Sequence, residues 1–273
     1  FNPACDAVST AELPLLDRWM LQRTAEVMDE ITEAFENYEF FRFFQLLQNF
    51  CVTDLSNFYL DIAKDRLYVS APADRRRRSC QTVMSMIIER LAGLIAPVLC
   101  HMAEDIWQNL PYEVEETSIF QRGWPTVPAD WRDPSLSEPI QRLRELRAAV
   151  NRVLEECRSQ QELGASLEAA VRIEPRNAEL HSAINWLNEN GDAEADGLRD
   201  WLLVSQLQLG GEPWAELLAN QTGETAIIEV GRARGFKCER CWHYEADVGQ
   251  HSQHPALCGR CCSVLDRRDH QLA

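Results

Sequence analysis

Two pairs of closely spaced cysteines near the end of the 273-residue chain constrain its fold more than any other feature. Within FKCERCWHYEADVGQHSQHPALCGRCC, two residues separate Cys238 from Cys241, sixteen residues follow, and Cys258 and Cys261 repeat the spacing. Two Cys-x2-Cys turns supply four thiolates in a tetrahedron, which zinc prefers in structural sites. The sequence therefore predicts one structural Zn²⁺ bound by these four cysteines, in a knuckle whose folding depends on the ion.

Other residues near these cysteines are weaker candidates for the metal. Cys262 directly follows Cys261, so it does not keep the Cys-x2-Cys spacing, and three histidines inside the knuckle could replace a thiolate: His243, His251 and His254. A closed set of four thiolates leaves no position for water, so the predicted metal is structural rather than catalytic. The alternatives are a thiol redox switch and a chance grouping of cysteines.

The first cysteine pair encloses a basic residue and is followed by an aromatic one. Arg240 lies between Cys238 and Cys241, Trp242 follows, and Lys237 precedes the pair. Unpaired bases stack on exposed aromatic rings, and cations beside the ring bind phosphates. The same pattern also fits a tryptophan that only covers the small zinc core. Composition alone does not decide between an RNA contact and such a lid.

Apolar residues at three- and four-residue steps predict four long helices. We expect Asp74 to cap the third helix and Pro97 to kink it. Residues 111–136 contain four prolines and predict a crossover, which Trp124 and Trp131 hold against the helices. Short connections between long helices indicate an antiparallel bundle. The expected helices are residues 13–38, 40–67, 74 to about 110, and 138–161.

The region that precedes the knuckle shows mixed patterns. Alternating β-formers predict strands at residues 166–175, 202–209 and 225–234, with a helix at 178–189. The fold class is therefore mainly α, an antiparallel helix bundle followed by a small α+β subdomain and a four-cysteine zinc knuckle. The expected domains are residues 1–136 (bundle and crossover), 137–230 (fourth helix and α+β junction) and 231–273 (knuckle).

Charge is distributed unevenly along the chain. The net charge is −16, whereas residues 230–273 carry seven basic and five acidic residues. An acidic body with local basic positions suits a protein that contacts RNA only at selected places. Further candidates for phosphate contacts are Lys64, Arg66 and the run Arg75–Arg78, chiefly Arg75 and Arg76, although such cations are equally consistent with salt bridges or a solvated helix start.

Other sequence features exclude some classes of protein. No run of 18 apolar residues occurs, so we expect no membrane span. Five scattered cysteines without paired spacing predict reduced thiols in a cytoplasmic protein. No glycine-rich phosphate loop occurs, and no two histidines have the spacing of a metal or nucleophile site. The residues alone therefore indicate a binding protein rather than a catalyst.

Several segments resemble one family of enzymes. FCVTDLSNFYLDIAKDRLY and RRSCQTVMSMIIERLAGLIAPVLCHMAEDIW resemble the anticodon-binding helical domain of the isoleucine, valine and leucine class I aminoacyl-tRNA synthetases. SIFQRGWP and RLRELRAAVNRVLEECRSQQELGASLEAAV resemble the isoleucine enzymes in particular. The tail from FKCERCWHY to CGRC is similar to the C-terminal zinc knuckle of bacterial-type isoleucyl-tRNA synthetases. The resemblance covers nearly the whole chain.

This resemblance implies a role in tRNA recognition. In the family the Arg and Trp of the knuckle contact anticodon nucleotides, which implies the same role for Arg240 and Trp242. The family's H-x-G-H and K-M-S-K-S motifs, which bind ATP, do not occur in this sequence. The resemblance thus implies the C-terminal third of an ATP-dependent isoleucine–tRNA ligase, without its catalytic and editing domains and inactive alone. The expected partner is the anticodon stem-loop of an isoleucine-accepting tRNA, bound by a monomer.

Two rival interpretations remain at this point. The first is a stand-alone zinc-ribbon adaptor that binds RNA or protein, and the second is a thiol-based redox sensor. Both keep the cysteine cluster but require no catalytic partner domain.

Overall fold

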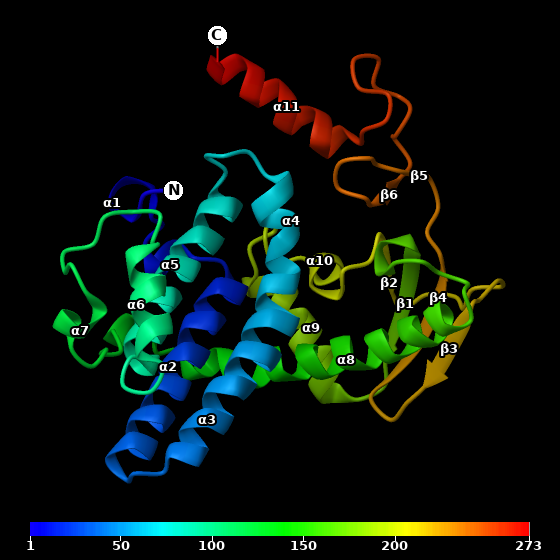
Figure 1. Cartoon of the computed structure of the whole chain (residues 1–273). Coiled ribbons are helices and arrows are strands. Elements are labelled where there is room, and N and C mark those ends of the chain that lie inside the picture. The colour runs from blue at the N-terminus through cyan, green and yellow to red at the C-terminus, as the bar shows by residue number, and fades with distance from the viewer. Residues whose placement is uncertain (273) are drawn as a thin grey trace. The chain divides into compact units, whose positions relative to one another are not determined.

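The computed structural model describes residues 1–272, and their side chains up to residue 266, as two compact units. Unit 1 comprises Phe1–Leu67 and Pro72–Ser137, and unit 2 comprises Tyr68–Ala71 and Glu138–Ala273. The expected fold class is confirmed: the chain is mainly α-helical with small sheets (Figure 1), and four of its cysteines form a cluster. The three-part division at residues 136 and 230 stays a prediction, and its last residue, 273, lies outside the described residues.

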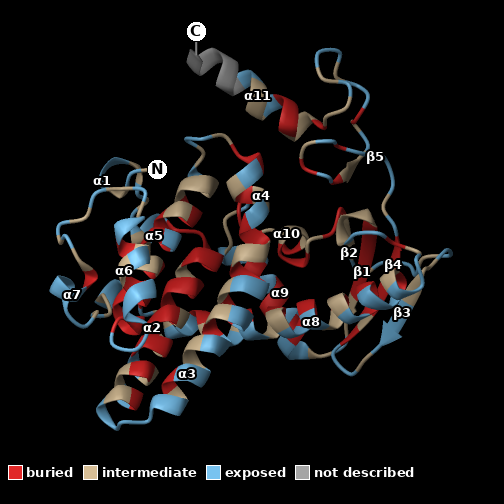
Figure 2. Ribbon diagram, in the orientation of Figure 1, coloured by how far each residue is buried: buried red, intermediate tan, exposed pale blue. Residues whose placement is uncertain are grey.

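The first long helix of unit 1 follows the predicted apolar stripe. Residues 13–38 were expected to be helical, and α2 extends over Leu15–Glu36. Leu16, Met20 and Ile31 on this stripe are completely buried, which Figure 2 shows as the red face of α2. Short helical turns precede it: α1 (Pro3–Asp6) and η1 (Thr10–Glu12).

The second predicted helix, residues 40–67, is continuous but changes its winding. It comprises α3 (Phe40–Asn49), the π-helical stretch η2 (Phe50–Leu60) and α4 (Asp61–Val69). In a π-helix each N–H reaches five residues back rather than four, so the turns are wider. Phe50, Asp54 and Phe58, four residues apart, are all buried. Residues four apart lie on one face of a helix, so this stretch still presents a single side to the core.

The third predicted helix is two helices rather than one kinked helix. Asp74 caps α5 (Arg75–Ile95) as expected, since its carboxylate accepts from the backbone N–H of Arg76 at 2.8 Å. The helix ends before Pro97 and a new one, α6 (Cys100–Gln108), begins afterwards. Proline lacks an N–H and its ring clashes with the preceding turn. The predicted apolar face ends there too, because Val98 and Met102 are about half exposed.

The proline-rich crossover lies against the helices of unit 1 through its tryptophans, as predicted. Trp131 is buried, with the Arg90 guanidinium 5.0 Å from its ring centroid. Trp124 donates from Nε1 to Thr32 Oγ1 at 3.0 Å and contacts the Phe35 ring edge-to-face. The crossover contains only short helical turns: α7 (Ile119–Arg122), η3 (Ala129–Trp131) and η4 (Pro134–Leu136).

A buried ion pair lies at the centre of unit 1. Arg66 donates to Asp17 at 2.8 Å, and the hydroxyl of Tyr59 donates to the same carboxylate at 2.5 Å. The side chains of Arg66 and Asp17 are 1% and 0% exposed. The prediction that Arg66 contacts an RNA phosphate is therefore wrong, because the guanidinium is inaccessible and already neutralised. Burial raises the pKa of Tyr59, so its hydroxyl stays protonated and donates.

Unit 2 is built on a mixed four-stranded sheet. Its order is β2-β1-β4-β3, with β1 parallel to β2 and antiparallel to β4, and β3 antiparallel to β4. The helices between β1 and β2 supply the crossover that a parallel pair requires. These elements are α8 (Ser137–Ser159), η5 (Ser166–Glu168), β1 (Ala169–Pro175), α9 (Ala178–Asn190), α10 (Leu198–Leu202), β2 (Gln206–Leu209), β3 (Ala219–Thr222) and β4 (Ala226–Arg232).

The predicted elements of this region are mostly confirmed. The fourth helix, the first strand, the following helix and the last strand correspond to α8, β1, α9 and β4. The strand predicted at 202–209 is shorter, because α10 occupies its beginning, and β3 was not predicted. β3 has the sequence ANQT and is largely exposed, so it carries no apolar alternation to detect. None of the helices that the structure describes is both long enough and apolar enough to cross a lipid bilayer.

Replacing Arg66 by Ala should destabilise the protein strongly. The change leaves the Asp17 carboxylate buried without its cation, and breaking a buried pair in this way costs about 3–5 kcal/mol. Urea denaturation followed by circular dichroism measures the loss. The matched control is Arg42→Ala, which removes exposed ion pairs to Glu33 and Glu39 and should leave the midpoint almost unchanged. Equal midpoints for the two variants would contradict the assigned role of Arg66.

Candidate metal centre

The first cysteine pair lies in a tight hairpin. β5 (Phe236–Lys237) pairs with β6 (Tyr244–Glu245) in antiparallel register. Between them Cys238 donates its N–H to the carbonyl of His243, and Trp242 donates back to the carbonyl of Cys238, both at 2.9 Å. Trp242 has φ +66°, a left-handed conformation that bulky residues rarely adopt. The turn therefore directs two thiols toward one point at the expense of backbone strain.

The second cysteine pair lies where α11 (Gly259–Leu272) begins. Cys258 precedes the helix, and Cys261 is in its first turn. The carboxylate of Asp247 accepts from the backbone N–H of Gly259 at 2.7 Å, and this bond holds the pKa of Asp247 below its ordinary value. A Cβ at Gly259 would lie 2.7 Å from that carboxylate oxygen, so the close approach requires glycine. His251 Nε2 lies 3.3 Å from the same carboxylate.

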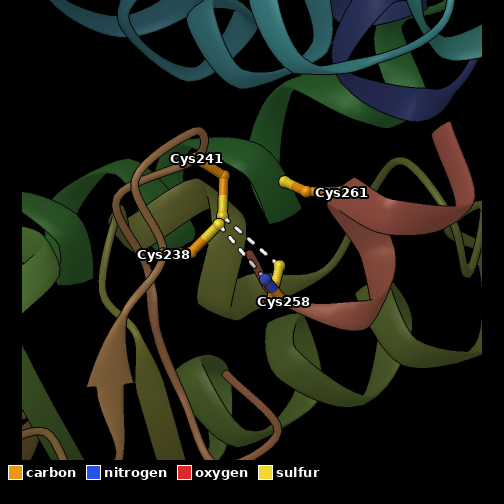
Figure 3. Close-up of side chains that lie close together, drawn as sticks. All are labelled: Cys238, Cys241, Cys258 and Cys261. Carbon is orange, nitrogen blue, oxygen red and sulfur yellow. Dashed lines mark hydrogen bonds between the residues drawn. The ribbon is translucent and has the colours of Figure 1, made fainter. Parts of the chain in front are cut away.

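The four predicted thiols converge on one point, as Figure 3 shows. Their sulfur atoms all lie within 4.8 Å of one another, and all four residues are buried. Cys241 Sγ and Cys258 Sγ are 3.7 Å apart. A tetrahedral zinc with bonds of about 2.3 Å separates its sulfurs by about 3.8 Å. The donor set and its dimensions therefore fit one structural Zn²⁺.

Contacts within the cluster favour a thiolate. Hydrogen bonds from Cys241 and Cys261 lower the pKa of Cys258, whereas contacts with Cys241 and Cys258 raise the pKa of Cys261, so the negative charge rests on Cys258. The backbone N–H of Cys258 in turn donates to Cys238 Sγ at 3.4 Å. Thiolates rather than thiols ligate zinc, so these bonds stabilise the form that a metal requires.

The weaker metal candidates lie outside this group. Cys262 is directed at the carbonyl of Leu257, with 4.0 Å between sulfur and oxygen, and His251 faces Asp247. Within the part of the chain that the structure describes, the residues that could hold a metal together are the four cysteines alone. Neither His243 nor His254 belongs to that group.

The knuckle also brings together the three RNA contacts predicted beside the cysteines. The side chain of Trp242 is 60% exposed, and Lys237 Nζ lies 5.6 Å from the centroid of its ring. Arg240 directs Nη1 at Cys261 Sγ over 3.8 Å. An outer contact of this kind orients the arginine on the metal site itself. A ring so exposed covers the cluster only in small part.

The cations predicted in unit 1 are engaged with acids or carbonyls. Lys64 pairs with Asp61 at 2.8 Å, and Arg76 pairs with Asp65 at 3.5 Å. Arg75 donates to the carbonyl of Glu12. With Arg66 buried, the structure does not favour these residues over the knuckle as RNA contacts, and their role as phosphate contacts stays a prediction.

Sequence reasoning missed the residues that support the knuckle. Asp247 was not singled out, although the glycine between the second pair of cysteines, in CGRC, signals a backbone contact there. Ser205 was missed as well; its hydroxyl accepts from the N–H of Tyr244 at 2.8 Å and donates to the carbonyl of Leu167. Contacts between residues so distant in the chain leave no local pattern.

Two family models match the chain. Residues 17–173 match the model described as the anticodon-binding domain of tRNA ligase. Residues 235–264 match the model described as a zinc finger found in FPG and IleRS. The second match contains all four clustered cysteines and Trp242, in agreement with the zinc dimensions of the cluster.

Several isoleucine–tRNA ligases are similar in sequence to this chain over nearly its whole length. It is 78% identical over 272 residues to isoleucine–tRNA ligase of Parasynechococcus marenigrum (strain WH8102) and 73% identical over 268 residues to that of Synechococcus sp. (strain CC9311). A third ligase, of Prochlorococcus marinus subsp. pastoris (strain CCMP1986 / NIES-2087 / MED4), is 50% identical over 266 residues. The alignments cover 97–100% of this chain, which spans about 28% of the length of these relatives.

Metal analysis of the purified chain should give one zinc per molecule. Cys258→Ser should lose the ion, because three thiolates and a hydroxyl bind zinc less well than four thiolates. Cys262→Ser is the matched control and should keep the full equivalent, since its sulfur faces a carbonyl. Loss of zinc from the Cys262 variant but not from Cys261→Ser would reverse the ligand assignment.

Asp247→Ala should weaken zinc binding by up to about tenfold, because the beginning of α11, which carries Cys261, loses its cap. Competition with a chromophoric chelator measures the affinity. Asp247→Asn keeps an oxygen acceptor for Gly259 and should bind zinc nearly as the parent does. An alanine variant with unchanged zinc affinity would show that the cap does not support the metal site.

Proposed function

The chain belongs to the family of anticodon-binding domains of tRNA ligases, and from that premise we propose that it recognises the anticodon of an isoleucine-accepting tRNA. The observation that carries this proposal is the exposed Trp242, held with Arg240 on a cluster of four thiols. The relatives that extend over its whole length are isoleucine–tRNA ligases. The chain is proposed to be the part of such a ligase that binds tRNA.

The geometry of the knuckle supports base stacking. The Trp242 ring offers an open face, and Lys237 beside it supplies a cation for a phosphate. Arg240 is oriented through Cys261 and presents further guanidinium donors to a base edge or a phosphate. A platform held by a metal site loses little conformational entropy on binding, so more of the stacking energy appears as affinity.

The cysteines Cys238, Cys241, Cys258 and Cys261 would hold the zinc in this proposal. When bound, the ion supplies a rigid centre for the knuckle and no reactive position, because four thiolates complete its coordination. The residues of the chain do the recognition: the ring stacks, the guanidinium and the ammonium bind acceptors, and Asp247 holds the helix that carries Cys261.

Aminoacylation itself is proposed for the whole ligase rather than for this chain. The chain spans about 28% of its relatives, and its sequence contains neither of the ATP-binding motifs of the class I synthetases. In the proposal the catalytic and editing parts lie in the remainder, and anticodon binding positions the tRNA for them. A stand-alone zinc-ribbon adaptor is not favoured, because the likeness to the ligases extends over the whole chain.

The setting of the protein is part of the same proposal. None of the ten cysteines forms a disulfide in the structure, and five of them are scattered away from the knuckle, which suits the reducing cytoplasm where tRNA is charged. We propose a monomer that binds one anticodon stem-loop.

Trp242→Ala should weaken binding of an isoleucine tRNA anticodon stem-loop by roughly five- to 150-fold. A base stacked on an aromatic side chain contributes about 1–3 kcal/mol by alanine substitution. Fluorescence anisotropy with a labelled stem-loop measures the affinity, and zinc content is determined on the same preparation. Zinc should be retained, because the four thiols remain.

Two other outcomes would count against this role of Trp242. Loss of zinc together with RNA affinity would identify the ring as a lid over the metal site. Unchanged affinity with intact zinc would exclude base stacking on the ring. Trp186→Ala, a change on α9 away from the knuckle sequence, serves as the matched tryptophan control and should leave affinity unchanged.

A further inference from the structure

Unit 2 contains a cleft of about 1110 Å³ that none of the predicted contacts uses. It is lined by residues of β2, by the segment 212–218 and by residues 231–234, at the end of β4. Two arginines line it, Arg232 and Arg234, and both side chains are exposed. Two accessible cations therefore lie in the wall of this cleft.

These two arginines are uncommitted, unlike most cations of the chain. Neither Arg232 nor Arg234 makes an ion pair with any residue that the structure describes. By contrast Arg66, Arg76 and Arg172 are each paired with an acid. An exposed guanidinium without an acidic partner keeps its five donors available for an external anion.

The backbone that carries the arginines is held in place. Gln206 clamps the backbone of Arg234: Oε1 accepts from its N–H at 3.0 Å, and Nε2 donates to its carbonyl at 2.9 Å. The N–H of Ala233 donates to the carbonyl of Glu168 at 2.8 Å. The backbone of this segment is fixed by hydrogen bonds while the arginine side chains remain unpaired. This arrangement is typical of a preorganised binding site.

The segment leads directly into the knuckle. Phe236, two residues after Arg234, is 69% exposed, and Lys237 follows it. From Arg232 to Trp242 the chain thus presents a series of cations interleaved with two exposed rings. That composition suits a single nucleic-acid strand, whose phosphates meet cations while its bases meet aromatic faces.

The opposite charge in the cleft lies on another segment. Glu212 and Glu216 line it from the segment 212–218, whose Trp214 donates from Nε1 to Gln208 at 2.9 Å. The cations are therefore confined to the segment that continues into the knuckle, and a polyanion would follow that segment.

We propose that Arg232 and Arg234 bind phosphates of the RNA strand that adjoins the bases at Trp242. The inference rests on the proposed function and deepens it, because it assigns a phosphate-binding track beside the base-reading knuckle. Phosphate contacts fix the register of a strand and carry no sequence information of their own. The arginines would align the anticodon loop so that its bases reach Trp242 and Arg240.

The test is the double variant Arg232→Gln/Arg234→Gln, assayed against the anticodon stem-loop over a range of salt concentrations. Each lost phosphate contact should lower the slope of log affinity against log salt by about one, so the slope should fall by about two. Affinity at low salt should fall roughly tenfold. The loss should be equal for stem-loops with the correct and an altered anticodon.

Two further variants control for fold and for charge in general. Arg152→Gln removes an exposed arginine from α8 that makes no ion pair within the described residues, and should leave slope and affinity unchanged. Arg232→Lys/Arg234→Lys keeps both charges and should restore most of the slope. Zinc content measured on every variant checks that the knuckle is intact.

The outcomes separate this inference from the proposed function. An unchanged salt slope in the glutamine variant, while Trp242→Ala still weakens binding, would overturn the phosphate track and leave anticodon recognition standing. A loss that depends on the anticodon sequence would also overturn it, because the arginines would then read bases. No binding of the stem-loop by the parent chain would overturn both.

Discussion

The knuckle has too few apolar side chains to form a hydrophobic core, so the four cysteine sulfurs take the place of that core. The four cysteines lie in a small buried cluster. The knuckle contributes few apolar side chains to this cluster, among them Val248 and the partly buried Leu257. Four sulfurs within 4.8 Å of one another gain little without an ion that binds them. The placement of Trp242 and Arg240 depends on this centre. The proposed recognition by these two residues would therefore be coupled to metal binding.

The sequence predicted best what local spacing determines. Each Cys-x2-Cys pair, the stripe along α2 and the cap at Asp74 depend on residues only a few positions apart. It predicted poorly what depends on distant partners. Arg66 looks like a surface cation until Asp17, 49 residues earlier, is found beside it in the core. Pro97 was expected to kink one helix, whereas the chain ends α5 before it and begins α6 after it. A proline can either kink or end a helix, and packing with distant residues decides between the two.

In the proposed function, the distribution of paired and unpaired charge would decide where on the protein RNA binds. With a net charge of −16 the body repels a polyanion, which lowers binding at arbitrary sites. Most cations of unit 1 that the sequence drew attention to are neutralised by acids or engaged by carbonyls. Among the residues whose side chains the structure describes, Arg232, Arg234 and Lys237 are exposed cations without an ion pair that lie close together in the sequence. If Arg232 and Arg234 bind phosphates as proposed, acidic surroundings and a short basic track would together restrict where RNA binds, without requiring a basic protein.

The left-handed backbone at Trp242 has a consequence for how the ring is presented. A residue in this conformation costs roughly 1–3 kcal/mol, and it persists only where its surroundings over-determine it. Here the hairpin between β5 and β6 imposes the conformation, so the direction of the Cα–Cβ bond is set by the backbone rather than by packing of the indole. The ring can then be mostly solvated and still point one way. In the proposed function, the indole would therefore be oriented before a base arrives.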